Sequence, residues 1–388
     1  MTNVGAVMAL SILLLLPACH LVLPLSSGPS TDAPPAADIP PAADLPEVGV
    51  VDVVDAGDTD APACTTLVQT GEVQPRGSKT IPVPGIKPGC SFIVCSFRTN
   101  GSEPYNAGTC QLEGNDLVIA TGNAAAEAFV RYHLVQLAGA SVQRGHVLLG
   151  KMELGQTLSL QDAVDRDRTF VLVTTRADVI SAGKDQQRLV LARLDSPTSL
   201  ALERGESGVA VDVEWQVVQL GRATVESRTT AIPSGDSSAQ ASITPVEINR
   251  TFVVFSSKAG SEAGGDEEVY GVRGRLEDSQ HLVFERGVFG AQIDVHWFVV
   301  QLPPGNRVFR SYADFAPTSL TASGWVPSVE LNRALPLSSS YIKGSGSSLF
   351  DALSLTVRLL DTNTVELERG DNDELPLSYS WSVVELAP

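Results

Sequence analysis

The sequence predicts an all-β protein in which four small antiparallel β-sandwich domains follow one another. One segment recurs four times at a nearly constant spacing. Short runs of Val, Ile, Leu and aromatic residues alternate with turns rich in Gly, Ser and Asp, and no helical stripe of comparable strength is present. We therefore expect repeated β-sandwich domains, preceded by an N-terminal export segment and a disordered linker.

The N-terminus carries an apolar run over residues 6–18, which is shorter than the roughly 20 residues that span a bilayer. Such a run is typical of a secretory signal. It ends in the tetrapeptide Leu-Pro-Ala-Cys at residues 16–19, which resembles the lipobox of bacterial lipoproteins. The resemblance implies a signal peptide over residues 1–18, lipidation at Cys19 and a membrane partner through the lipid. By the sorting rule of that family, His20 implies the outer membrane or cell surface; the alternative is that Cys19 simply lies in a cleaved signal.

Residues 19–63 are rich in Pro, Ala and Asp and contain the motif Pro-Pro-Ala-Ala-Asp twice, at 34–38 and 40–44. The stretch from residue 26 to residue 63 holds eight acidic residues and no basic one. Proline favours extended polyproline II geometry, and like charges extend a chain further. We interpret this segment as a solvated spacer between the membrane and the folded domains.

The repeat is defined by four segments whose final leucines are separated by 83, 82 and 84 residues. The segments are residues 130–137, 213–220, 295–302 and 379–386, with Tyr132, Trp215, Trp297 and Trp381 at the same position. This spacing divides the folded part into repeat 1 (64–139), repeat 2 (140–222), repeat 3 (223–304) and repeat 4 (305–388). We expect five to seven strands in each repeat, which favours a small sandwich over a solenoid.

The recurring segment has the alternation of a β-strand with one face in a core. Around Trp215, valines occupy every second position and polar residues the positions between them. This alternation predicts that Trp215, Trp297 and Trp381 lie between the two sheets, where a large aromatic side chain packs well. The alternative is that these rings stack on sugars.

Four cysteines remain after Cys19, and all of them lie in repeat 1: Cys64, Cys90, Cys95 and Cys110. An even number in an exported protein predicts two disulfides, for which three pairings are possible. A zinc site is not favoured, because Cys90 and Cys95 lack Cys-x-x-Cys spacing and no histidine is close.

Alignment of repeat 1 with repeat 2 favours one of the three pairings. It places Cys90 at the position of Arg168 and Cys110 at the position of Arg193. If these two positions are neighbours, the disulfides are Cys90–Cys110 and Cys64–Cys95. A gap of one residue in the alignment would instead place Cys110 in the core.

Arginine recurs at three positions of the repeat. The nine residues are Arg168, Arg250 and Arg333 at the start of a strand, Arg193, Arg275 and Arg358 25 residues later, and Arg204, Arg286 and Arg369 in a Glu-Arg-Gly motif. A planar guanidinium binds carboxylates or sugar hydroxyls well, so these are candidate ligand or inter-domain contacts. The alternative is that they form structural ion pairs with Glu203, Glu285 and Glu368 or with acidic residues of a neighbouring strand.

The end of each repeat has Val or Ile, one further residue, Trp and two hydrophobic residues, within a compact all-β unit. This pattern resembles the H-type lectin domain, a six-stranded sandwich that binds N-acetylgalactosamine. The resemblance covers the last two or three strands of each repeat and implies carbohydrate binding. The family's Trp-His pair is not reproduced, since His296 precedes Trp297, and no sugar-binding residue is carried over.

Composition and motifs exclude several other functions. A formal charge of −18 with only six lysines argues against a nucleic-acid partner. The five histidines have no metal-site spacing, and neither a Gly-x-Ser-x-Gly motif nor a phosphate loop is present, so we expect no enzyme activity, cofactor or metal. The acidic runs at 266–268 and 371–374 lack the ligand offsets that calcium prefers and are interpreted as solvated loops.

The sequence therefore predicts a lipid-anchored surface protein that acts in recognition or adhesion, with a glycan or a surface protein as its ligand. Repetition suits this function because several weak sites on one chain raise avidity. The alternative is a structural component of the envelope or of an appendage that binds other proteins. A lectin should have a similar pocket in each repeat, whereas a scaffold should have a continuous patch across repeats.

Overall fold

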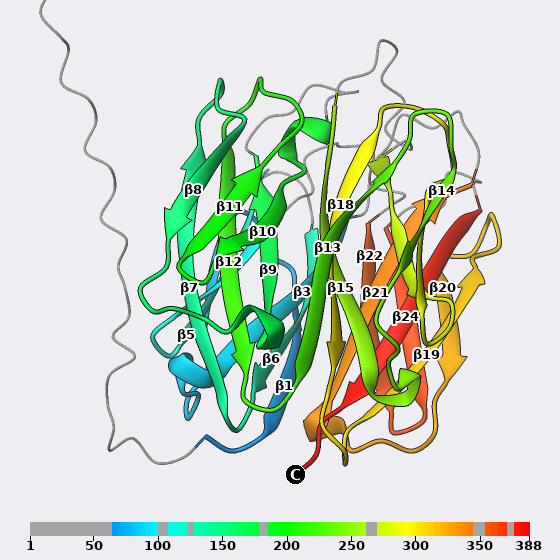
Figure 1. Cartoon of the computed structure of the whole chain (residues 1–388). Helices are drawn as coiled ribbons and strands as arrows, with labels where there is room; N and C mark the ends of the chain where they lie inside the picture. Colours follow the sequence, from blue (N-terminus) through cyan, green and yellow to red (C-terminus); the bar gives the residue numbers. More distant parts are fainter. Residues whose placement is uncertain are drawn as a thin grey trace, which may run out of the picture. The chain divides into compact units, whose positions relative to one another are not determined.

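The computed structural model describes residues 64–99, 108–122, 128–177, 185–260, 270–343, 354–370 and 376–388. The expected signal peptide, lipidation site and linker (1–63) lie outside these residues, as do the two acidic runs at 266–268 and 371–374. The strands form eight three-stranded sheets with antiparallel pairing (Figure 1), which confirms the all-β prediction. None of the helical turns in the described residues has the length and apolar character that a membrane span requires.

The described residues of each of the four repeats form six strands. Repeat 1 contains β1 (Leu67–Val73), β2 (Ser78–Pro82), β3 (Ser91–Thr99), β4 (Gly108–Glu113), β5 (Asp116–Thr121) and β6 (Ala128–Gln136). Repeat 2 contains β7 (Ala140–Leu149), β8 (Gly155–Ser159), β9 (Thr169–Arg176), β10 (Leu191–Ser196), β11 (Ser199–Glu203) and β12 (Val211–Leu220). Repeat 3 contains β13 (Thr224–Ile232), β14 (Ser238–Ser242), β15 (Thr251–Ala259), β16 (Arg273–Leu276), β17 (His281–Glu285) and β18 (Ile293–Gln301). Repeat 4 contains β19 (Arg307–Asp314), β20 (Thr321–Trp325), β21 (Ala334–Ile342), β22 (Leu355–Asp361), β23 (Thr364–Arg369) and β24 (Leu377–Glu385).

Every repeat pairs its strands by the same rule. The first, sixth and third strands form one sheet, and the second, fifth and fourth strands form the other, as in β7-β12-β9 and β8-β11-β10 of repeat 2. A short 3-10 turn precedes the third strand of each repeat, namely η1 (Pro88–Cys90), η2 (Arg166–Arg168), η4 (Ile248–Arg250) and η6 (Leu331–Arg333). The sixth strand is therefore central in its sheet and brings the recurring aromatic residue to the middle of the sandwich.

The recurring tryptophans lie in the cores of their repeats. Trp297 is fully buried, and Trp215 and Trp381 are each 5% exposed, so the predicted core placement is confirmed. Glycines make room for two of these rings, one on the paired strand β7 and one on β20 of the other sheet of repeat 4. A Cβ atom on Gly145 would collide with the indole of Trp215, and one on Gly324 would collide with that of Trp381.

The repeats contact one another at four equivalent joints. At each joint a hydroxyl on the third strand of one repeat accepts a hydrogen bond from a main-chain N–H on the fourth strand of another. The pairs are Cys110 N–H to Thr174 (3.2 Å, joint 1–2), Ala192 N–H to Ser256 (2.9 Å, joint 2–3), Gly274 N–H to Ser339 (3.1 Å, joint 3–4) and Val357 N–H to Ser96 (3.3 Å, joint 4–1). Because joint 4–1 links the last repeat to the first, the four joints form a closed cycle.

The third strands also share an apolar cluster. Phe92 packs edge-on against Phe170, and Phe170 against Phe252, with ring centroids 5.8 and 6.1 Å apart. Leu335, at the same position of repeat 4, belongs to the same buried cluster. Residues from all four repeats thus bury apolar surface together, which stabilises the cycle through the hydrophobic effect.

Repeat 1 contains two disulfides, Cys64–Cys90 and Cys95–Cys110. The pairing of Cys90 with Cys110, favoured by the sequence alignment, was wrong. Cys110 donates its N–H at joint 1–2 as Ala192 does at joint 2–3, so Cys110 is equivalent to Ala192. The position of Arg193 is taken by Gln111, and Cys110 faces the core, where it is 2% exposed.

Candidate functional site

The arginines of the Glu-Arg-Gly motif are buried inside their own repeats. Arg204, Arg286 and Arg369 are 2%, 2% and 1% exposed. Arg204 donates to the main-chain carbonyls of Gly150, Glu153 and Val209, and the other two make the same kind of bond. A guanidinium has five N–H donors, so one side chain can satisfy several carbonyls of irregular loops. These three arginines hold loops together and are not accessible to a ligand.

The arginines on the fourth strands pair with carboxylates. Arg193 contacts Glu203 at 2.5 Å, and Arg275 contacts Glu285 at 3.1 Å. Arg358 pairs instead with Glu366 at 2.6 Å and approaches Glu72 of repeat 1 at 3.7 Å. The ion pairs with Glu203 and Glu285 are therefore present in repeats 2 and 3, and in repeat 4 the partner is an acidic residue of the neighbouring strand, the other alternative considered from the sequence.

The arginines before the third strands lie at the 3-10 turns. Arg250 binds Glu247 and donates to the carbonyl of Leu302 at 2.6 Å, and exposed Arg168 donates to the carbonyl of Gly221 at 3.2 Å. Arg333 is half-buried, and its main-chain carbonyl accepts the N–H of Leu386. The nine arginines, three in each of repeats 2, 3 and 4, are therefore spread along their repeats and do not form one site.

The Glu and Gly of the motif contact the next repeat. Glu203 binds Lys258 of repeat 3, which is the main reason that the pKa of this glutamate lies below its ordinary value. A Cβ atom on Gly205, Gly287 or Gly370 would collide with the main chain at Ala259, Ile342 or Thr99, each in the next repeat of the cycle. The Gly of the motif therefore lies at three of the joints, whereas the arginines, for which an inter-domain contact was considered, bind within their own repeats at this position.

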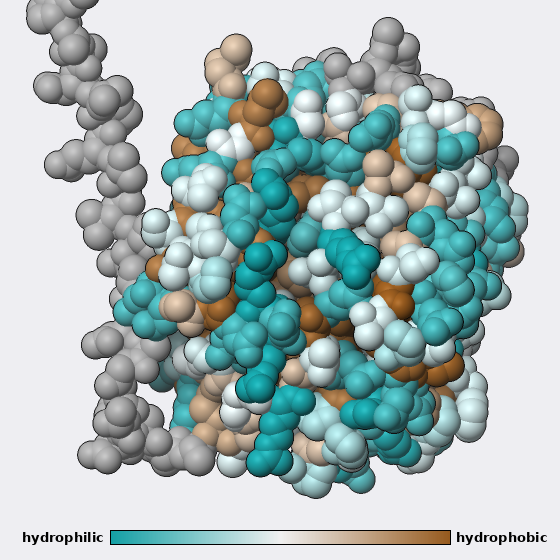
Figure 2. Space-filling model, viewed as in Figure 1, coloured by the Kyte–Doolittle hydropathy of each residue, from teal (hydrophilic) through white to brown (hydrophobic). Residues whose placement is uncertain are grey.

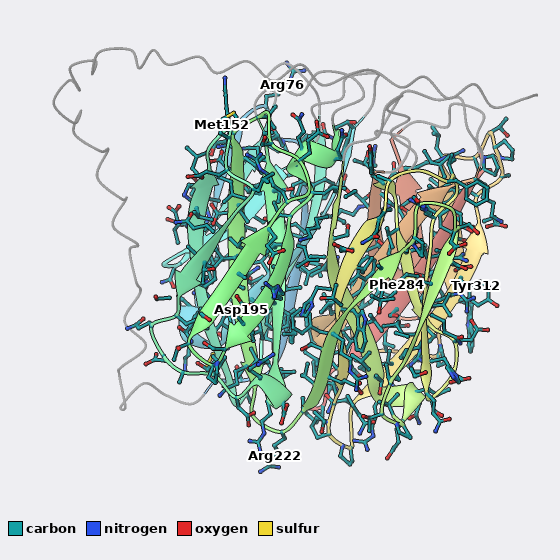
Figure 3. All side chains as sticks on the ribbon, turned by 45° about the horizontal axis from the view of Figure 1, so that its top comes forward. Arg76, Met152, Asp195, Arg222, Phe284 and Tyr312 are labelled. Carbon is teal, nitrogen blue, oxygen red and sulfur yellow. A yellow bond between two sulfur atoms is a disulfide. The ribbon has the colours of Figure 1, made fainter. Side chains whose placement is uncertain are left out.

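A cavity of about 630 Å³ lies at joint 3–4. Its walls come mainly from the third strands of repeats 3 and 4, from β16, β19 and β24, and include Val253, Leu337 and Ser382. Residues of β3 and β6 in repeat 1, Leu172 of β9 and Val357 of β22 also line it, so all four repeats contribute to the cavity. Arg275 and Tyr312 also line it. Tyr312 is 58% exposed and lies at the outer edge of the molecule (Figure 3), so the cavity reaches the surface beside this ring.

A second, more open depression of about 490 Å³ lies on the other side of Arg310. It is lined by Trp325, Phe309 and Ile248, together with Asn249 and Arg310. Trp325 is 72% exposed, which is unusual for so large an apolar side chain. On the face seen in Figure 2, hydrophilic residues predominate and hydrophobic residues show only as small patches.

Arg310 lines both cavities and has spare donor capacity. Its guanidinium donates to the carbonyl of Thr251 at 2.9 Å, and within the described ranges it forms no ion pair. Burial lowers the pKa of Arg310 to about 10. A partly buried cation without a carboxylate partner favours ligands that supply acceptor oxygens.

Sequence reasoning missed Arg310, Trp325 and Ser382. The repeat pattern could have identified Arg310, because Arg310 precedes Trp381 by the same interval as Arg144 precedes Trp215. It could not have identified Trp325, since Pro82, Ser159 and Ser242 occupy that position in the other repeats. The described residues contain no group of three side chains of metal-binding type. A scan against protein-family models and a search of curated proteins gave no match.

Proposed function

We propose that the chain is a non-enzymatic recognition module displayed at the cell surface on a lipid-anchored tether, and that it binds carbohydrate in the depression around Trp325. The observation that carries the proposal is the 72% exposed indole of Trp325 beside the incompletely used guanidinium of Arg310. An aromatic face packs against the C–H face of a pyranose, while arginine and amide donors bind its hydroxyl groups.

The depression differs from the arrangement expected of a repeated lectin. Only repeat 4 has an aromatic residue at the position of Trp325; the corresponding residues of the other repeats are Pro or Ser. The proposal is therefore one carbohydrate site per chain. Higher avidity would come from several chains on the same membrane, because the lipid anchor concentrates them.

The test is a glycan-array screen of the full chain, repeated with Trp325→Ala. We expect the variant to lose at least about tenfold in affinity, because stacking contributes on the order of 1.4 kcal/mol. Phe289→Ala is the matched control, since Phe289 is also an exposed aromatic residue (64%) but lies in repeat 3, away from the depression. Glycan binding that survives Trp325→Ala unchanged would refute this site.

A second candidate function is a protein-binding component of the envelope. Leu148, Met152 and Leu154 are 55%, 83% and 54% exposed at the end of β7 and in the connection to β8, and Met152 lies at one end of repeat 2 (Figure 3). Exposed apolar residues in one place favour a protein contact. Absence of glycan binding by the folded chain would favour this function, and substitution of the three residues by Ser would test it.

A further inference from the structure

Joints 1–2 and 3–4 share an arginine contact that sets them apart from the other two joints. Arg144 of β7 donates to the main-chain carbonyl of Ser91, and Arg310 of β19 donates to that of Thr251. Ser91 and Thr251 are both the first residue of the third strand of their repeats. The two joints can therefore be compared residue by residue from this point.

At joint 1–2 a side-chain amide binds the main chain of the third strand two residues after Ser91. The Nε2 of Gln216 donates to the main-chain carbonyl of Ile93 at 2.9 Å, and the N–H of Ile93 donates to the Oε1 of Gln216 at 2.8 Å. Gln216 is only 7% exposed, so this amide is part of the buried joint. One amide can make both bonds because the N–H and C=O of a residue in an antiparallel strand point to the same side.

At joint 3–4 the residue at the position of Gln216 is Ser382, which has no amide. Ser382 follows Trp381 as Gln216 follows Trp215, and Val253 is the third residue of β15 as Ile93 is of β3. Serine has no carboxamide. Val253 and Ser382 both line the cavity of about 630 Å³.

The strand register shows where the main-chain groups of Val253 point. Val253 pairs with Val299 of the central strand as Ile93 pairs with Leu134. The N–H and C=O of Ile93 point away from the central strand, toward Gln216. Those of Val253 therefore also point away from β18, into the cavity.

We propose that this cavity binds a primary carboxamide of a ligand, in the place that Gln216 fills at joint 1–2. To pair with the N–H and C=O of one residue, an amide must present its own N–H and C=O on the same side. A primary carboxamide or a cis-amide ring does so, whereas peptide bonds and acetamido groups are almost always trans. The side-chain amides of Asn and Gln fit this requirement, and N-acetylated sugars do not, so the site is distinct from the carbohydrate site proposed above.

The rest of the cavity suits a group that carries such an amide on an apolar stem. Leu337, Val254 and Pro336 supply apolar wall, which favours burial of methylene groups. Arg310 adds a cationic donor, and the opening beside Tyr312 connects the cavity with the surface.

The experiment follows the amide signal of Val253 in NMR spectra of the ¹⁵N-labelled full chain. Acetamide is the primary amide probe, 2-pyrrolidone the cis-amide and N-methylacetamide the trans-amide. We expect acetamide and 2-pyrrolidone to shift the Val253 signal with dissociation constants on the order of 10 mM, as suits ligands of a few atoms. N-methylacetamide should bind at least about tenfold more weakly. A Val253 signal that acetamide leaves unchanged, or equal binding of N-methylacetamide, would overturn the proposal.

Two substitutions at one position provide the matched control. Ser382→Gln supplies the missing amide from the chain itself, so it should abolish the acetamide response and raise the melting temperature by about 2 °C. Ser382→Ala should keep the acetamide response of the unchanged chain. If Ser382→Gln binds acetamide as well as Ser382→Ala does, the amide does not occupy this position and the proposal fails.

The reverse substitution, Gln216→Ser, opens the corresponding position at joint 1–2. We expect acetamide to shift the Ile93 signal in this variant but not in the unchanged chain. The glycan test and the amide test fail separately, because the first depends on Trp325 and the second on Ser382 and Val253.

Discussion

Joint 4–1 and joint 2–3 are built from the same positions, although one links the two ends of the cycle and the other links consecutive repeats. Both use a hydroxyl of the third strand, Ser96 or Ser256, and both bring a motif glycine against the main chain of the next repeat. They differ in charge. At joint 2–3 the pair Glu203–Lys258 crosses between the described residues of the two repeats, whereas at joint 4–1 Glu368 binds both Arg98 and Arg131.

This difference has a physical reason. Consecutive repeats are held close by a short connection, which raises the effective concentration of one for the other. The residues that meet at joint 4–1 are far apart in sequence, 237 positions for Arg131 and Glu368, so their contact carries a larger loop-closure cost. We expect the additional ion pairs at joint 4–1 to offset part of that cost, and the predictions below test how strongly.

The largest effect is expected from Arg131→Met. Arg131 is 3% exposed and contacts Glu72 and Glu368 at 2.7 Å each. Its removal leaves three partly buried carboxylates, those of Glu72, Glu366 and Glu368, with only two cations beside them, Arg98 and Arg358. We expect a loss of about 3–5 kcal/mol in the free energy of unfolding, measured by denaturant titration. Addition of Glu368→Gln should recover part of the loss, and a loss below about 1 kcal/mol would mean that the closing charges contribute little.

Acid should weaken joint 4–1 through His133. The Nε2 of this buried histidine lies 3.2 Å from the carbonyl oxygen of Val357, and burial lowers its pKa to about 4, with a smaller contribution from Arg131. The folded state therefore favours the neutral ring. The resulting stability is fully present above the unfolded pKa of about 6.5 and is lost as the pH falls toward 4, by up to about 3 kcal/mol.

The measurement is the free energy of unfolding at pH 7 and pH 4.5 for the unchanged chain and for His133→Gln. The variant should lose less stability between the two values. His296→Gln on β18 is the comparison variant in repeat 3. Burial lowers the pKa of His296 to about 4 as well, so this substitution should reduce the acid sensitivity to a similar degree. An unchanged pH dependence in His133→Gln would contradict a role of this ring in acid sensitivity.

Most of the fold could be predicted from the sequence, because repetition supplies the same pattern four times. The alternation around Trp215 predicted its burial, and the turn signals predicted antiparallel strands. The disulfide pairing could not be predicted, since a shift of one residue at Cys110 exchanges a core position for a surface position. The joints could not be predicted either, because Ser and Thr at 96, 174, 256 and 339 do not differ in pattern from the other hydroxyl residues on the strands.

The candidate sites were hidden for a related reason. Repetition directed attention to the arginines that all repeats share, and these build the repeats and their joints. Arg310, Trp325 and Ser382 are instead positions at which repeat 4 departs from some or all of the other repeats. In a chain of this kind the shared residues specify the architecture, and we infer that binding depends on the exceptions.

A smaller effect is expected from Gly370→Ala. A Cβ atom at this position would collide with the carbonyl oxygen of Thr99, so the two repeats must move apart. Strain of this kind costs about 2 kcal/mol. Gly205→Ala makes the equivalent collision with Ala259 at joint 2–3, and Gly235→Ala, which meets no atom, is the control. The free energy of unfolding of each variant is measured by denaturant titration. If Gly370→Ala loses as little stability as Gly235→Ala, and Gly205→Ala loses more, joint 4–1 is not closed in solution.

The smallest effect is expected from Lys258→Met at joint 2–3. Lys258 and Glu203 are 24% and 28% exposed, and Arg193 also contacts Glu203, so the carboxylate keeps one cation when the lysine is lost. A partly exposed pair of this kind contributes about 0.5–1 kcal/mol. Lys258→Met removes a partly exposed cation, whereas Arg131 is only 3% exposed, so the loss in Lys258→Met should also shrink in high salt, as expected for a solvent-accessible pair. A loss equal to that of Arg131→Met would mean that both joints depend on charge to the same degree, and the cost of closing the cycle would then have to be met by apolar packing of the third strands.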